Sequence, residues 1–503
     1  MYLFKKSGLI FLTLLSLNSM AQIKKPGVFV QEIAALPPSV AQVETAIPAF
    51  IGYTEKADEK GVADLLFKGR RVSLLIEYEK YFGKGYHIRP VKLLLDNNNK
   101  VSRVELDHTG YLLYESVKNY FNNGGGPCYI ISIGGYFSKP RSSDFQVGLN
   151  VARKLDEITL LLLPEAVNLS GADLYEIQQL ALEQAGSLAD RFCIMDLKYA
   201  EDKITHDFVV AEFRNWIGTN QLKYGAAYTP FVKTMVNQEY AYREWKDIIW
   251  KIDRPVKLSQ VITDPVFVQQ LTELEQLIAS NNSGEQQKER EILASFPEMK
   301  AIADKMRQAE LALPPSSAIA GVYCSVDRTR GVWKAPANVA LYGYNKPILS
   351  FNDRLQEELN VDVTTGKSIN VIREFSGRGT QVWGARTLAG NDNEWRYVPV
   401  RRFFITVEES IKKATNRFVF EPNDANTWTR IKAMIENYLT QKWREGALMG
   451  TKPEQAFYIK VGLGSTMTNQ DILEGRLIVE IGMAPVRPAE FIILRFQLKM
   501  EKK

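Results

Sequence analysis

Three glycine-containing motifs carry residue types that could bind phosphate, and each lacks part of the required pattern. Gly366-Lys367-Ser368 matches the end of a phosphate-binding loop, but the first glycine of that loop would have to stand at Val361. Gly377-Arg378-Gly379 begins a dinucleotide fingerprint whose third glycine would have to stand at Val382. The cluster Gly124–Gly126 follows a predicted helix, whereas a phosphate cradle precedes one. Plain turns account for all three motifs better than nucleotide binding does.

Acid–base and metal chemistry find equally little support. Asp327 stands beside Arg328 and Arg330, and an ion pair between loops explains this group better than a catalytic pair does. The three histidines and three cysteines lie outside ligand spacing of one another and form no C-x-x-C motif: His87, His108, His206, Cys128, Cys193 and Cys324. We therefore expect no catalytic residue, no cofactor site and no metal site, which argues against an enzyme.

Length and composition indicate a globular protein with several domains. A chain of 503 residues exceeds one ordinary core, so two or three domains are expected. Hydrophobic residues make up 45% and charged residues 24%, as in globular proteins. The net charge of +5 is small, and no basic stripe stands out, so nucleic acid is not an expected partner.

The first 22 residues allow two interpretations. Lys5-Lys6, the apolar run Gly8–Leu17 and Ser19-Met20-Ala21 together form the pattern of a secretory signal peptide. Alternatively, translation starts at Met20, and the upstream residues are not part of the protein. We favour the second interpretation, with export as the minority alternative, and expect no stable membrane insertion.

Both ends of the chain are predicted to form strands on proline-bearing joints. Near the start, Val28, Phe29, Val30 and Ile33 belong to a short β-rich run, which the linker prolines Pro37 and Pro38 follow. At the end, Phe491–Leu498 alternates, with one apolar face at Ile492, Leu494, Phe496 and Leu498. Pro485 and Pro488 precede this strand and are predicted hinges. Strands of this kind must add to a sheet, their own or a neighbour's.

Between the ends, the pattern predicts an α/β body. Strands are expected at 47–53, 128–133, 158–163 and 192–195, and helices at 72–82, 112–121 and 174–188. The strand–helix–strand succession from Ile158 to Met195 predicts a parallel βαβ unit. Residues 236–313 are rich in Gln, Glu and Lys and predict a mostly helical, solvent-exposed insertion.

The last hundred residues predict a small α+β domain. A helix should begin after Asn423 or Asp424, bury Trp428, Ile431, Ile435, Tyr438 and Leu439, and end at Gly446. Strands at 457–461 and 477–481 should form its sheet together with 491–498. The expected divisions are 1–22 leader or mis-assigned start, 23–45 N-terminal linking arm, 46–235 α/β domain, 236–313 insertion, 314–402 continuation of the α/β domain, 403–484 C-terminal polymerising domain and 485–503 C-terminal linking arm.

Several longer segments, in order along the chain, resemble the contractile phage tail sheath family. They include Pro26–Ile33, Asn122–Tyr129, Leu222–Tyr228, Arg330–Asn338, Trp383–Leu388, Phe420–Asn423, Gly446–Leu448 and Ala484–Phe491. The similarity is closest to sheaths of phage-tail-like contractile injection systems. The leader at residues 1–19 departs from the family pattern.

The resemblance implies a structural protein that polymerises helically around an inner tube and contracts to drive the tube through a target envelope. It implies partners of the same kind: neighbouring sheath subunits, the inner tube, and baseplate and terminator or cap proteins. It also implies cytoplasmic assembly into a tail-like particle that can be released, with no cofactor. The strand arms at both ends would link subunits, because an interface that does not close on itself makes a filament.

Two other interpretations remain open at this point. An α/β enzyme would use the Ile158–Met195 unit to bind a ligand, and an exported envelope protein would explain the leader. Trp333, Trp383, Trp395 and Trp428 are most simply core aromatics. The arginines at 330, 386, 401 and 402 would face the tube, pair between subunits or form ion pairs within one subunit.

Overall fold

The structure is a computed structural model that describes residues 40–108 and 110–495. Three separate apolar cores hold this part of the chain together. The leader, the predicted strand at Val28–Ile33, Pro37, Pro38, Phe496 and Leu498 all lie outside the described residues.

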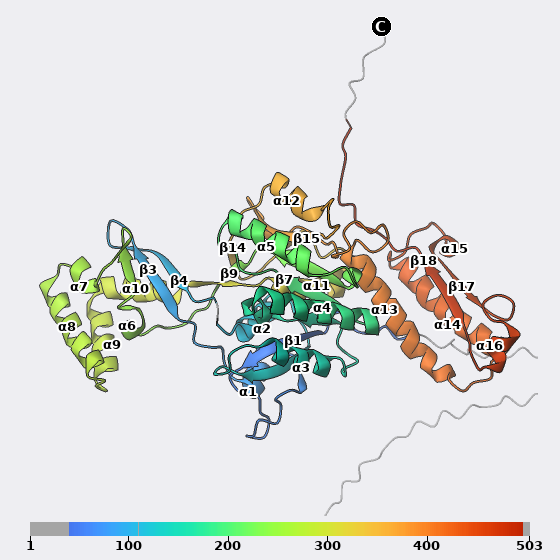
Figure 1. Ribbon diagram of the computed structural model, residues 1–503, viewed down its shortest axis with the longest axis horizontal. Coiled ribbons are helices and arrows are strands. Elements are labelled where there is room, and N and C mark those ends of the chain that lie inside the picture. Colours follow the sequence, from blue (N-terminus) through green and yellow to red (C-terminus); the bar gives the residue numbers. More distant parts are fainter. Residues whose placement is uncertain (1–39, 109, 496–503) are drawn as a thin grey trace, which may run out of the picture. The chain divides into compact units, whose positions relative to one another are not determined.

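The largest core surrounds a nine-stranded sheet (Figure 1). Its six central strands are parallel, from β15 to β5, and the strands at its edges are antiparallel. Across the sheet the strands are β13 (Val339–Ala340), β16 (Gly379–Val382), β15 (Ile369–Phe375), β8 (Gly225–Thr229), β7 (Phe192–Asp196), β6 (Leu160–Leu162), β1 (Pro48–Thr54), β5 (Cys128–Gly135) and β2 (Gly69–Val72). Parallel strands must be covered on both faces, which explains why β1, β6, β7 and β8 are buried along their whole length.

Helices from distant parts of the sequence pack on this sheet. They are α1 (Leu75–Phe82), α2 (Leu113–Asn122), α3 (Ser142–Ala152), α4 (Gly171–Leu188), α5 (Lys203–Trp216), α11 (Ser316–Arg330) and α12 (Asp353–Asn360), with short 3-10 turns η1 (Pro164–Asn168) and η2 (Leu222–Tyr224). Helices α2 and α11 pack on each other so closely that a Cβ at Gly321 would lie 2.6 Å from the carbonyl oxygen of Tyr120. The α/β body predicted from the sequence is therefore confirmed, including the parallel pair β6–β7 joined by α4.

A second core joins residues from two stretches of the sequence. Its four-stranded sheet runs in the order β11 (Arg254–Pro255), β10 (Ile249–Lys251), β3 (Pro90–Leu95) and β4 (Val101–Leu106). The helices around it are α6 (Tyr242–Trp245), α7 (Leu258–Val261), α8 (Pro265–Ala279), α9 (Glu285–Ser295) and α10 (Pro297–Arg307). A three-stranded sheet contains β12 (Glu310–Leu313), β9 (Val232–Met235) and β14 (Tyr344–Pro347). The region 236–313 is thus mostly helical, and it also encloses buried residues such as Trp245 and Leu271.

The third core belongs to the C-terminal region. It contains α13 (Val398–Thr415), η3 (Asn416–Phe418), α14 (Ala425–Arg444), α15 (Pro453–Ala456), β17 (Phe457–Val461), α16 (Asn469–Leu473) and β18 (Val479–Met483). Figure 1 shows α13 and α14 in orange and the two strands in red. The predicted long helix is confirmed as α14, and its cap is Asp424, whose carboxylate accepts a hydrogen bond of 2.9 Å from the Thr427 N–H.

The C-terminal sheet differs from its prediction in two respects. Strands β17 and β18 form an antiparallel two-stranded sheet, and Phe491–Arg495 does not join it. The second strand also starts two residues later than the predicted 477. The sheet therefore has an open edge on each side within the described chain.

Candidate subunit-linking site

The segment that follows β18 is held by the C-terminal region around the first predicted hinge. The Met449 N–H donates to the carbonyl of Ala484 at 2.8 Å, and the Val486 N–H donates to the carbonyl of Ala447 at 3.0 Å. Pro485 lies between these two bonds and bridges Leu448. Proline fits here because the donors of the two bonds are Met449 and Val486, so neither bond needs an N–H from Pro485.

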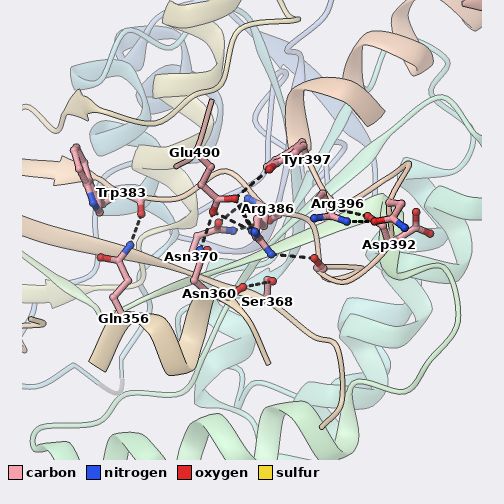
Figure 2. Close-up of polar contacts among 12 residues, drawn as sticks. Gln356, Asn360, Ser368, Asn370, Trp383, Arg386, Asp392, Arg396, Tyr397 and Glu490 are labelled. Atoms are coloured by element: carbon pink, nitrogen blue, oxygen red, sulfur yellow. Dashed lines mark hydrogen bonds and ion pairs between the residues drawn. The ribbon is translucent and has the colours of Figure 1, made fainter. Parts of the chain in front are cut away.

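Four residues after Val486, the carboxylate of Glu490 is hydrogen-bonded by side chains of the α/β body (Figure 2). Arg386 Nε donates to its two carboxylate oxygens at 3.0 and 3.1 Å, and Arg386 Nη2 donates at 2.6 Å. Asn360 Nδ2 donates at 2.7 Å and the Tyr397 hydroxyl at 3.1 Å. We call these four residues, Asn360, Arg386, Tyr397 and Glu490, the arm clip.

The body fixes Arg386 independently of Glu490. The backbone of Arg386 is held on both sides by Asn370 of β15, whose side-chain amide accepts from the Arg386 N–H at 2.8 Å and donates to its carbonyl at 2.8 Å. Arg386 Nη1 donates to the carbonyl of Gly390 at 3.0 Å. Residue 390 must be glycine, because a Cβ there would lie 1.8 Å from Ser368 Oγ. The guanidinium is thus aimed at the arm by the central sheet.

Burial and charge make the clip a strong contact. The Arg386 side chain is 4% exposed and that of Glu490 is 22% exposed. Burial alone would raise the pKa of Glu490, but the hydrogen bonds that it accepts from Arg386 and Asn360 outweigh burial and lower its pKa below the usual value. The carboxylate is therefore ionised at neutral pH, and the two-pronged guanidinium contact is of the stronger, charge-assisted kind.

Immediately beyond the clip, the apolar arm lies in solvent. Phe491, Ile492, Ile493 and Leu494 are between 69 and 79% exposed. Among the residues that the structure describes, Phe491–Arg495 pairs with no strand. Four adjacent exposed apolar side chains are unusual on a monomer and mark an interaction site. Pairing of this arm between subunits stays a prediction, as do the hinge roles of Pro485 and Pro488.

The start of the described chain is fastened to the same helix that leads into the C-terminal region. Val43 N–H donates to Ser410 Oγ at 3.0 Å, and Arg402 Nη2 donates to the carbonyl of Thr45 at 2.9 Å. Both Ser410 and Arg402 belong to α13. Val40 is buried in the C-terminal core. Residues 40–47, which we call the N-terminal root, are therefore held by the rest of the chain. The linking arm predicted at 23–45 lies mostly outside the described residues and stays a prediction.

Of the arginines singled out from the sequence, three form contacts within the chain. Arg386 binds Glu490, Arg401 binds Glu408 at 2.6 Å, and Arg402 binds Asp327 at 2.5 Å. Each of these arginine side chains is at most 4% exposed. This outcome favours the intrasubunit alternative. Asp327 does form an ion pair, but its partner is Arg402 and not the adjacent Arg328 or Arg330, because α11 directs Asp327 towards α13.

The other residues that the sequence offered for binding or catalysis have structural roles. Lys367 is buried and its ammonium donates to the carbonyl of Arg214, while Ser368 Oγ donates to the carbonyl of Asn360 at 2.5 Å. Both side chains are thus used within the fold. The tryptophans at 333, 383, 395 and 428 are half-buried. Within residues 40–108 and 110–495, no three His, Cys, Asp or Glu side chains are grouped so that they could hold a metal ion.

The sequence did not identify the clip as a site. Arg386 and Glu490 stand 104 positions apart, and only the fold brings them together. Helix α13 was also missed, although Val400, Phe403, Val407 and Ile411 recur at helical spacing and Pro399 stands in its first turn. That spacing could have predicted α13, the helix whose Arg402 and Ser410 hold residues 43–45.

The described chain is thus an α/β body joined to a small C-terminal α+β region, which ends in the exposed apolar segment Phe491–Leu494. No helix in the described part of the chain is long and apolar enough to cross a membrane. The family profile for the phage tail sheath C-terminal domain matches residues 390–499.

Comparison with solved structures extends the similarity to nearly the whole chain. The sheath complex of the extracellular contractile injection system PVC, in its contracted state, is 30% identical over 94% of this chain and 97% of that one, with a TM-score of 0.59. The helical sheath of the anti-feeding prophage, also contracted, is 29% identical over 94% of this chain and 98% of that one, with a TM-score of 0.59. The tail sheath protein of Vibrio phage KVP40 is 24% identical over 38% of this chain, and the match spans only 27% of that protein. The chain belongs to the contractile tail sheath family.

Proposed function

We propose that this protein is the structural subunit of a contractile sheath, which polymerises helically around an inner tube and contracts to drive the tube through a target envelope. The observation that carries the proposal is the 30% identity with a contracted sheath complex over 94% of the chain. The segments that resemble the family include Pro26–Ile33 and Ala484–Phe491, at the two predicted arms, and the family profile extends to residue 499, which supports the same mode of assembly.

The exposed C-terminal arm gives the proposal a physical basis. The two-stranded sheet β17–β18 has two open edges within the described chain, and sheets this small are marginal on their own. The chain also carries two predicted strands, at Val28–Ile33 and Phe491–Leu498. Arms from neighbouring subunits would add to both edges, which would cover the apolar side chains of Phe491–Leu494 and complete the sheet.

Contraction would then be a change in the packing of the subunit bodies while the strand arms stay paired. The partners of the subunit in this proposal are neighbouring subunits, the inner tube, the baseplate and a terminator or cap protein. Assembly would take place in the cytoplasm, and the particle would be released in some systems. The proposed role is structural and uses no cofactor, nucleic acid or membrane insertion.

Electron microscopy of the purified protein tests the proposal. The full chain should form tubes with a wide lumen, whereas deletion of residues 20–33 or truncation after Glu490 should leave a folded protein that does not polymerise. Circular dichroism and the melting temperature serve as the folding control. Discrete particles from the full chain, or normal tubes from either truncated chain, would contradict the proposal.

A further inference from the structure

The arm clip places the start of the free C-terminal arm at Phe491, beyond both predicted hinge prolines. Backbone bonds hold the chain up to Val486, and Glu490 is held by Arg386, Asn360 and Tyr397. Between them, the Arg487 guanidinium donates to the carbonyl of Asn393 at 2.9 Å. The residues from 486 to 490 therefore form a strap, fastened at one end to the C-terminal region and at the other to the α/β body.

We propose that the arm clip is the anchor through which tension on the C-terminal arm passes to the nine-stranded sheet, with Glu490 as a positioning residue for subunit linkage. This inference rests on the proposed sheath function. A pull on Phe491 is transmitted first to Glu490 and then to Arg386. The side chain of Asn370, in strand β15 of the sheet, holds the backbone of Arg386 through two hydrogen bonds. The small sheet β17–β18, where a neighbour's arm would pair, is then spared the pull of its own subunit's arm.

The length of the strap shows what the clip contributes. If Glu490 is released and the bond of the Arg487 side chain to Asn393 breaks with it, the next fixed point is the bond from the Val486 N–H to the Ala447 carbonyl. Residues 487–490 then join the free arm, which lengthens its reach by roughly 14 Å at full extension. That gain is about three times the spacing of about 4.8 Å between neighbouring strands. A linkage with so much slack cannot fix the distance between adjacent subunits.

Cleavage by a glutamate-specific endoproteinase tests whether the clip is closed in solution. The enzyme must take the Glu490 carboxylate into its own pocket. Release of fragments that begin at Phe491 and end at Glu501 or Lys503 from unpolymerised full-length protein, followed by mass spectrometry, therefore reports how often the clip opens. Tyr397→Phe and Asn360→Ala leave Glu490 in place and each remove one donor. Each should speed this cleavage by about tenfold, as expected for one lost hydrogen bond to a charged group.

Tyr129→Phe is the matched control, because the Tyr129 hydroxyl also donates to a glutamate, Glu157, at 3.1 Å, but far from the clip. It should leave cleavage after Glu490 unchanged. Equal rates for the wild type, Tyr397→Phe and Asn360→Ala would show that the clip is not closed in solution and would overturn the inference without touching the proposed function.

Tubes of the Glu490→Gln variant test the load-bearing role. The neutral amide of this variant cannot form the charge-assisted pair with Arg386, so the variant should still polymerise, because its arm strand is intact, but into short tubes with blurred layer lines. The matched control is Glu436→Gln, which removes an exposed carboxylate 3.7 Å from Lys432 on α14. Glu490→Gln tubes as long and as ordered as the wild type would overturn the inference. A full-length protein that forms no tubes would instead overturn the proposed function and this inference with it.

Discussion

The two arm roots are fastened to the body in different ways. At the N-terminal root, Arg402 binds a backbone carbonyl, that of Thr45, and Ser410 binds a backbone N–H, that of Val43. At the C-terminal root, which is the arm clip, Arg386 binds one side-chain carboxylate, that of Glu490. In both cases a buried arginine holds the root, but only at the C-terminal root does that arginine bind a side chain of the arm.

This difference determines which root can be released. The backbone groups of Thr45 and Val43 are present whatever the side chains are, and they carry no charge. Arg402 is also committed to Asp327, whose side chain is 4% exposed, so the N-terminal root is part of the core. The negative charge of Glu490, by contrast, can be removed by one substitution or by protonation. The C-terminal root is therefore the one that can be tuned, and the predictions below test this asymmetry.

The largest effect is expected from Arg402→Met. The substitution removes the donor to Thr45 and leaves the carboxylate of Asp327 buried without its cation. Loss of one partner of a buried pair costs about 3–5 kcal/mol of unfolding free energy. Urea unfolding of the variant and the wild type measures this loss of unfolding free energy. The double variant Arg402→Met, Asp327→Asn should recover part of the loss, and a loss below about 1 kcal/mol for the single variant would show that the N-terminal root is not part of the core.

Glu490→Ala should cost less, about 1–3 kcal/mol, because the carboxylate is 22% exposed and water can reach the guanidinium that it leaves. The same urea titration applies, with Glu436→Gln expected within about 0.5 kcal/mol of the wild type. If Glu490→Ala proved as costly as Arg402→Met, the two roots would be equally integrated, and the comparison would fail.

The sequence predicted the body more successfully than either root. Strands such as β6 and β7 are short apolar runs, and α14 has both an apolar stripe and a capping aspartate, so local pattern was sufficient. In helix α13 the apolar stripe is interrupted by the buried Arg401 and Arg402, so its sequence does not show a clear amphipathic pattern. The clip depends on residues of three separate segments that only the tertiary fold aligns. Ion pairs of this range leave no periodic signal in a sequence.

The stability that Glu490 contributes should depend on pH, whereas the bond between Arg402 and the Thr45 carbonyl has no titrating acceptor. Because the pKa of Glu490 is lowered in the folded protein, its contribution is present above the unfolded pKa of about 4.5 and is lost as pH falls through the lower folded value. The difference in unfolding free energy between the wild type and Glu490→Gln should therefore shrink from pH 7 towards pH 4 and below. A difference that stays constant over this range would show that the carboxylate is not held by charge.

The smallest effect is expected from Ser410→Ala. Ser410 Oγ accepts from the Val43 N–H at 3.0 Å, and because Val43 is only half-buried, water can replace the hydroxyl. The loss should be about 0.5–1 kcal/mol, the net value of one ordinary hydrogen bond. Hydrogen exchange at the Val43 amide should quicken, while the amide of Ile47, which donates to Thr159 Oγ1 at 2.7 Å, should stay as slow as in the wild type. Faster exchange at both amides would mean that the N-terminal root opens as one unit, and that it is as easily released as the C-terminal root.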